Sequence, residues 1–170
     1  MAVGNNLTVG GVPIYGLING TAVASTSGTS IDFTSIPSWV KRVTVMFNAV
    51  STTGTSAIVI QLGSGSVVTT GYNGAVGAIT TAGAVGAATA TSYIYVSTNI
   101  SAATALYGST ILSLLGSNTW VSQGAAYSQG ITASYATGSL ALSGALDRVR
   151  ITTVNGTDTF DAGSINILYE

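Results

Sequence analysis

The sequence predicts an all-β protein, an antiparallel β-sandwich of jelly-roll type preceded by a short N-terminal arm. Three observations lead to this prediction. The polar residues are mostly Thr, Ser and Asn, and the 22 glycines suit tight turns and disfavour helix interiors. Apolar and polar residues alternate in several short segments, as half-buried strands require. No segment has the 3.6-residue period of an amphipathic helix, so about eight short strands separated by turns are expected.

The chain of 170 residues is predicted to have two parts. Residues 1–26 form an arm for docking or assembly, because closely spaced glycines and Pro13 interrupt any long regular element. Residues 27–170 form the β-sandwich domain. A domain of this size can bury one core without disulfides or metals.

The first strands of the domain are predicted on either side of a turn. In residues 40–48, Val43, Val45 and Phe47 fall on one face of a half-buried strand. Residues 57–62 are a continuous apolar run, which favours a central strand covered on both faces.

The middle of the chain is predicted to be less regular. Residues 63–91 are rich in Gly, Ala and Thr, which favours long loops or short edge strands. Strands are predicted again at residues 92–96 and 110–115. The second of these is expected to form a hairpin with residues 119–121 through a turn at residues 116–118.

The C-terminal part shows the clearest strand pattern. A strand at residues 138–142 precedes an alternating strand at residues 146–154. Asn155-Gly156 is the dipeptide favoured in two-residue hairpin turns, so residues 157–160 are predicted as the returning strand. A last alternating strand is predicted at residues 164–170.

Charged and metal-binding side chains are scarce. The chain has four Lys or Arg, five Asp or Glu, no His and no Cys, and residues 43–146 contain no charge. Acid–base catalysis, activated nucleophiles and metal sites depend on such side chains, so a non-enzymatic role without a cofactor is predicted. The chain has no Lys and Arg cluster and no strongly apolar segment, so neither nucleic-acid binding nor membrane insertion is expected.

Low charge together with a mean hydropathy of +0.54 indicates that copies of the chain assemble. Copies repel each other little, and apolar surface needs cover. A monomer with an unusually large core is the alternative. The charged residues at the two ends of the charge-free stretch meet if the strand at 40–48 lies beside the strand at 146–154. Those predicted to form ion pairs for assembly or an interface are Asp32, Lys41, Arg42, Asp147, Arg148 and Arg150.

Two other kinds of site were weighed. Asp147, Asp158 and Asp161 include a carboxylate pair for glycoside cleavage or oxygen ligands for a cation, although turn chemistry is the more ordinary role of such residues. Aromatic rings in polar, Gly-rich segments suit stacking on sugars or on a protein partner. The residues predicted for ligand contact are Tyr72, Asn73, Trp120 and Tyr127. Core or subunit-interface packing is the more ordinary role of these aromatic residues, especially of Trp39 and Trp120, which adjoin predicted strands.

Two segments carry a resemblance to a known family. Residues 27–47 read SGTSIDFTSIPSWVKRVTVMF, and residues 140–170 read LALSGALDRVRITTVNGTDTFDAGSINILYE. They resemble the opening and closing segments of a domain of bacteriophage virion proteins that often stands at the C-terminus of tail-fibre-like chains. The resemblance spans residues 27–170 and is strongest at the two ends. It implies a protein on the particle surface and supplies no catalytic residues.

These observations lead to one leading hypothesis. The chain is expected to be a non-enzymatic bacteriophage virion structural protein, synthesised in the bacterial cytoplasm and exposed on the virion as a homotrimer. The trimer is implied by the family and by the low charge. A tail-fibre or receptor-binding role, with a host surface glycan or protein as partner, stands ahead of capsid decoration, which the short arm would suit. A polysaccharide-cleaving tailspike is the remote alternative.

Overall fold

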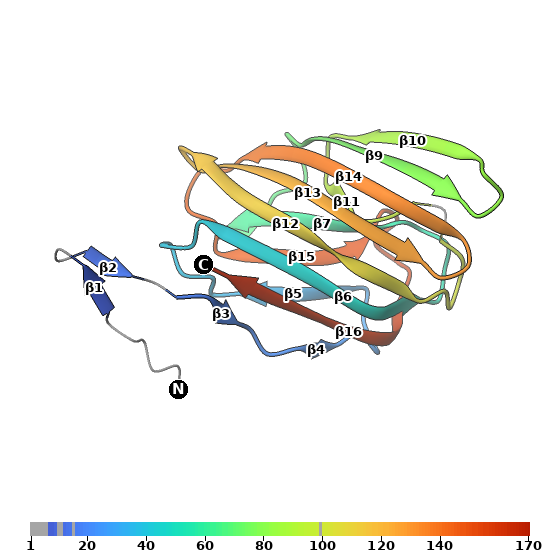
Figure 1. Cartoon of the computed structure of the whole chain (residues 1–170), viewed down its shortest axis with the longest axis horizontal. Coiled ribbons are helices and arrows are strands. Elements are labelled where there is room, and N and C mark those ends of the chain that lie inside the picture. The colour runs from blue at the N-terminus through green and yellow to red at the C-terminus, as the bar shows by residue number, and fades with distance from the viewer. Residues whose placement is uncertain (1–6, 10–11, 15, 99) are drawn as a thin grey trace.

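The computed structural model describes residues 7–9, 12–14, 16–98 and 100–170, and these residues contain strands and no helix. All strand pairs are antiparallel, which confirms the all-β antiparallel prediction. The strands form two large layers and a separate N-terminal hairpin (Figure 1).

The larger sheet has nine strands. In spatial order its strands are β10 (Val85–Ala90), β9 (Asn73–Thr80), β14 (Thr132–Ala141), β13 (Thr119–Ser128), β12 (Leu106–Gly116), β6 (Arg42–Thr52), β16 (Phe160–Tyr169) and β3 (Ile18–Asn19), with β4 (Val23–Ala24) also paired to β16. The arm region therefore covers one edge of this sheet, through β3 and β4, while β10 forms the other edge. The predicted boundary between residues 26 and 27 stays a prediction.

The smaller sheet lies against the inner face of the larger one. Its strands are, in order, β11 (Ile94–Tyr95), β7 (Ile58–Ser64), β15 (Arg148–Thr153) and β5 (Ser30–Thr34), with β8 (Ser66–Val67) paired to β7. A two-stranded sheet of β1 (Leu7–Val9) and β2 (Val12–Ile14) is separate from both.

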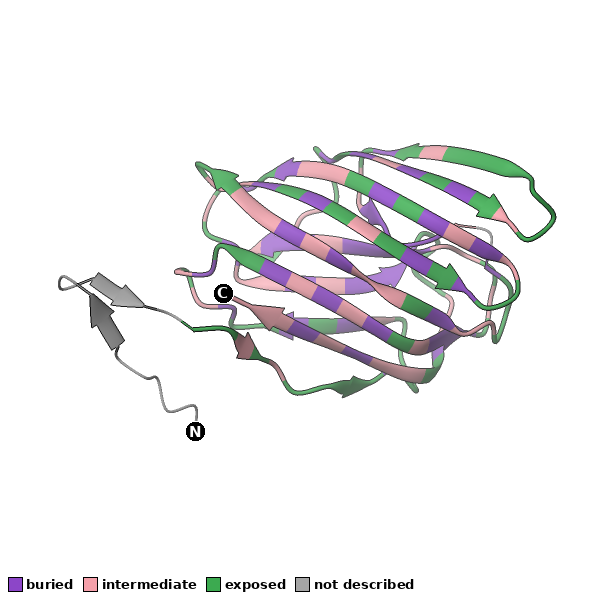
Figure 2. Cartoon of the chain, viewed as in Figure 1, coloured by how far each residue is buried: buried purple, intermediate pink, exposed green. Residues whose placement is uncertain are grey.

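The core lies between the two large sheets. Val43 and Val45 of the larger sheet belong to the same buried cluster as Ile60 and Ile151 of the smaller sheet. Buried and more exposed residues alternate along the strands of the larger sheet, visible as bands in Figure 2. This alternation is the period-2 pattern expected where one face of a sheet is covered.

The predicted central hairpin is confirmed, and it is longer than predicted. Residues of β12 and β13 pair from Leu106↔Ser128 to Gly116↔Thr119. The two residues between the strands, Ser117 and Asn118, have φ values of 47° and 59°. Two successive positive φ values are those of a type I′ turn, whose twist matches that of the flanking strands.

The hairpin predicted at Asn155-Gly156 is wrong. β15 pairs with β5 and β7 in the smaller sheet, whereas β16 pairs with β6 in the larger one. The turn is present, since Gly156 has a φ of 67° and its N–H donates to the carbonyl of Thr153. It carries the chain from one layer to the other, because residues distant in sequence provide the pairing partners for both strands.

The middle of the chain is more regular than expected. β10 is an edge strand, as predicted, but β9 lies inside the larger sheet between β10 and β14. Val76 and Ala78 of β9 point to the buried side, with 2% exposure each. Small residues on long strands are thus ordered by their neighbours on both sides.

Candidate functional site

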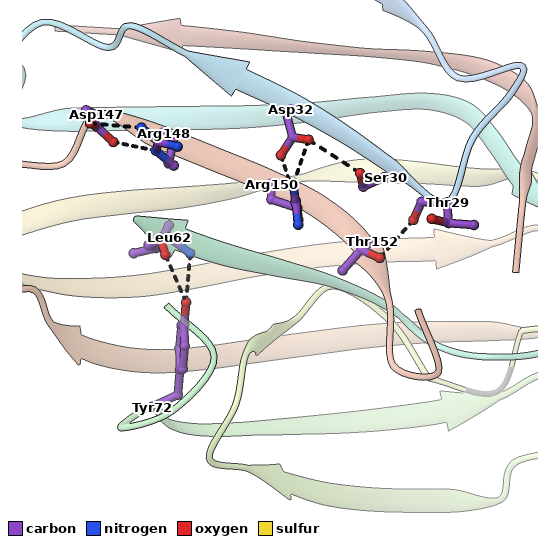
Figure 3. Close-up of polar contacts among 9 residues, drawn as sticks. All are labelled: Thr29, Ser30, Asp32, Leu62, Tyr72, Asp147, Arg148, Arg150 and Thr152. Atoms are coloured by element: carbon purple, nitrogen blue, oxygen red, sulfur yellow. Dashed lines mark hydrogen bonds and ion pairs between the residues drawn. The ribbon is translucent and has the colours of Figure 1, made fainter. Parts of the chain in front are cut away.

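Three charged residues predicted for assembly lie on the smaller sheet, on β5 and β15. Asp32 and Arg150 are register partners on these strands, and Arg150 Nε and Nη2 donate to the two carboxylate oxygens of Asp32 at 2.7 and 3.0 Å (Figure 3). The Asp32 carboxylate raises the pKa of the Arg150 guanidinium through these hydrogen bonds. Both side chains are about one-third exposed, at 37% and 35%. The pair therefore fixes the register of a sheet edge while remaining in contact with water.

A second ion pair lies at the start of β15. Arg148 Nε donates to Asp147 Oδ1 at 2.7 Å (Figure 3). The N–H of Gly65 donates to Asp147 Oδ2 at 2.9 Å. The hydrogen bond from Arg148 is the main cause that lowers the pKa of Asp147, and the same contact raises the pKa of Arg148. The Asp147 carboxylate thus holds the turn at Gly65, between β7 and β8, to the beginning of β15.

The other two predicted assembly residues lie elsewhere. Arg42 begins β6 of the larger sheet and pairs with Glu170, with 3.0 Å between Nε and Oε1. The backbone N–H groups of Lys41 and Arg42 both donate to the Glu170 carbonyl. Because β6 does not pair with β15, the expected single cluster is divided between the two sheets. Glu170 is the ion-pair partner of Arg42, and sequence reasoning did not identify it.

Two of the residues predicted for ligand contact lie in the core, which corrects that expectation. Tyr72 is 3% exposed and Trp120 is 2% exposed. The Tyr72 hydroxyl accepts the N–H of Leu62 at 2.7 Å and donates to the carbonyl of Val68 at 2.9 Å (the contact with Leu62 is drawn in Figure 3). Burial raises the pKa of Tyr72 to about 12. A ring enclosed in this way cannot stack on a ligand at the surface.

The other two predicted contact residues are exposed on the larger sheet. Asn73 begins β9, and Tyr127 lies on β13 with 45% exposure. The Tyr127 hydroxyl accepts the N–H of Gly130 at 2.8 Å, which holds the ring over the end of the strand. The two residues lie on different strands of one outer face.

This outer face is the most distinctive surface of the molecule, and we call its outward-pointing residues on β9, β10, β12, β13 and β14 the uncharged face. The strand register places one row of side chains, four of them large, across all five strands. The row consists of Tyr107, Tyr127, Ala133, Ile79 and Val85. None of the five strands contains a charged residue.

The uncharged face carries tyrosine and aliphatic side chains among Ser, Thr, Asn and Gln, and it is shallowly hollowed beside Tyr135, which is 62% exposed. One hollow of about 410 Å³ lies against Tyr135 and includes Ile111 and Gln123. A second of about 300 Å³ lies between the rings of Tyr107, Tyr127 and Tyr135. Sequence reasoning noted the aromatic residues near Tyr127 but missed Ile79, Val85 and Tyr107, since only the pairing of the strands brings them together.

The carboxylates weighed for catalysis or cation binding are used in local structure. Asp158 accepts the N–H of Ser56 at 2.9 Å and the side-chain amide of Asn155 at 2.6 Å. Asp161 accepts the hydroxyl of Ser51. Among the described residues, no three His, Cys, Asp or Glu side chains lie together in a way that could hold a metal ion. Asp158 thus has the turn-stabilising role that its sequence position favoured.

Comparisons with models of protein families, with curated proteins and with solved structures return no match for this chain. Within the part of the chain that the structure describes, no helix has the length and apolar character needed to span a membrane.

Proposed function

We propose that this chain is a non-enzymatic structural subunit of a bacteriophage virion, exposed on the particle surface as a homo-oligomer, in a tail-fibre or receptor-binding component. The observation that carries the proposal is the resemblance of residues 27–47 and 140–170 to the ends of a virion-protein domain. In the fold these two segments supply β5, the first part of β6, β15 and β16, and they pair with each other in both sheets: β5 with β15 and β6 with β16. The resemblance therefore concerns one continuous part of the structure.

The surface chemistry supports a structural role. A broad sheet face without charge suits contact with another protein subunit, because no charged group loses its hydration when the face is covered. Six of the nine charged residues form three ion pairs, and one of these, Asp32–Arg150, joins two paired strands at a sheet edge. These features favour assembly over chemistry.

We also propose that the two facing layers form a β-sandwich of jelly-roll type. The consecutive strands β5, β6 and β7 alternate between the smaller and the larger sheet. β15 returns from far along the chain to lie between β5 and β7. A jelly roll likewise has two packed sheets joined by connections that cross between them.

The proposed function is tested by locating the protein on particles. Gold-labelled antibody raised against the chain is applied to intact virions of a phage that encodes it, and the particles are viewed by electron microscopy. Label at the tail extremity is the expected result, and soluble protein is then expected to compete with infection for host cells. Label spread over the head would replace the tail role with capsid decoration. Virions that carry no label would refute the virion proposal.

A further inference from the structure

The two sheets differ in where they carry charge. Asp32, Arg148 and Arg150 lie on β5 and β15 of the smaller sheet, where each takes part in an ion pair. The uncharged face of the larger sheet instead presents tyrosines and aliphatic side chains, among them Tyr135 at 62% and Val85 at 81% exposure. The smaller sheet therefore presents charged side chains to water, whereas the uncharged face of the larger sheet has none of these strongly hydrated groups.

We propose that the uncharged face is the surface through which copies of this chain associate, so that its occupant is a second copy. This inference rests on the homo-oligomeric part of the proposed function and names the surface that makes the oligomer. The second copy covers the exposed tyrosines of this face together with its aliphatic side chains, namely Tyr107, Tyr127, Tyr135, Ile79, Val85 and Val121.

Charge is the first argument for a second copy. Protein interfaces are depleted of charged residues at their centre and enriched in Tyr. The net charge of the chain is −1, so two copies repel each other weakly. If they meet through the uncharged face, their five strands bury no charged side chain, and the ion pairs of the smaller sheet stay in water.

The size of the face is the second argument. Its five strands contain 6 to 11 residues each. With strands about 4.8 Å apart and about 3.3 Å per residue, the face measures roughly 24 by 30 Å, or on the order of 700 Å². Stable protein interfaces bury about 800 Å² on each partner. The face thus has the area that one subunit contributes to a stable contact.

A sugar ligand would cover less of the uncharged face than a second copy of the chain would. A few sugar rings would fill the hollow of about 410 Å³ beside Tyr135. They would leave Ile79, 51% exposed, and Val85 in water near the β10 edge of the face. A second copy of the chain is large enough to cover these residues and the hollow at once.

The test introduces a positive charge on the face and compares it with a matched substitution elsewhere. Val121 lies on β13 in the uncharged face and is 38% exposed, whereas Val154 follows β15 and is 44% exposed. Val121→Lys and Tyr135→Lys are the test variants, and Val154→Lys is the control. The mass of each purified full chain is measured by size-exclusion chromatography with light scattering over a range of concentrations, and folding is monitored by circular dichroism.

We expect the wild type and Val154→Lys to exceed the 16.9 kDa mass of one chain. Val121→Lys and Tyr135→Lys should shift to that mass, with a dissociation constant at least about tenfold higher, because an unpaired Lys must lose its hydration in the contact. Tyr135 is exposed enough that its replacement leaves the core unchanged.

Three outcomes would overturn the inference: a monomeric wild type, test variants that keep the wild-type mass, or an equal loss in the Val154→Lys control. Test variants that keep their mass but lose binding to host glycan would assign the face to a ligand instead. These results are independent of the antibody labelling of virions. A labelled particle with a monomeric chain refutes the oligomer and its interface but not the virion location, and an oligomer without virion label refutes the virion role alone.

Discussion

The Tyr72 hydroxyl takes the place of a missing strand, and its removal by Tyr72→Phe tests this role. β11 pairs with β7 only at Ile60 and Val59, so it ends before Leu62. At Leu62 the backbone N–H donates to the Tyr72 hydroxyl at 2.7 Å, and the carbonyl accepts the N–H of Val68. In Tyr72→Phe the N–H of Leu62, a residue with 0% exposure, loses its partner in a place that water does not reach.

The expected effect follows from that unpaired group. A buried backbone N–H left without an acceptor costs about 1–3 kcal/mol, so we expect the free energy of unfolding to fall by about 2 kcal/mol. For a domain of this size, the Tm should fall by about 4–8 °C. Urea unfolding followed by tryptophan fluorescence measures the change, since Trp120 is in the same core.

Tyr135→Phe is the matched control. Its ring is 62% exposed on a single chain, so at protein concentrations too low for association its hydroxyl is in contact with water and should contribute within about 0.5 kcal/mol. Equal losses in the two variants, or a loss below about 0.5 kcal/mol in Tyr72→Phe, would refute the role of the Tyr72 hydroxyl as a replacement for a strand.

Three further predictions concern pH, an ion pair and Gly163, which lies where the register between β16 and β6 shifts from Ala162 to Ser164. Burial raises the pKa of Tyr72 from 10.0 to about 12, so the contribution of its neutral hydroxyl to stability is complete below pH 10 and is lost as the pH rises through the folded-state pKa. Urea titrations should show a steeper loss of stability between pH 10 and 12 in the wild type than in Tyr72→Phe, and parallel curves would contradict this. A double-mutant cycle of Asp32→Asn and Arg150→Gln should give a coupling free energy of about 0.5–1 kcal/mol at low salt and a smaller one in 1 M NaCl, because the ion pair is partly exposed. A coupling free energy that salt does not change would be inconsistent with an exposed ion pair. Gly163 has a φ of 89° and no space for a Cβ beside the Ala49 carbonyl, so Gly163→Ala should lower the unfolding free energy by about 2 kcal/mol or more. Gly77 has open space around it, so Gly77→Ala should change the unfolding free energy by less than about 0.5 kcal/mol, and similar losses in the two variants would contradict the steric argument.

Sequence reasoning succeeded where the signal is local. The alternation of Val43, Val45 and Phe47 identifies the buried side of β6 because a strand with one covered face repeats every two residues. The turn predicted at residues 116–118 identifies the hairpin of β12 and β13, and the structure narrows it to Ser117 and Asn118.

It failed where distant segments decide. Asn155-Gly156 makes a turn, but whether the next strand pairs with the previous one depends on β5, β7 and β6. For the candidate site, the charged residues were identified, but their partners were not. Asp32 meets Arg150 because β5 and β15 are neighbours, and Arg42 meets Glu170 because β16 lies beside β6.

The sequence by itself determined that this protein is built of antiparallel strands and that most of its length carries no charge, because composition and residue period are properties of the chain alone. Only the tertiary structure decided that Tyr72 and Trp120 are buried and that Tyr107, Tyr127, Ile79 and Val85 share one row. The physical reason is that strand order and register depend on hydrogen bonds between residues far apart in sequence, and these fix which side chains meet on a face.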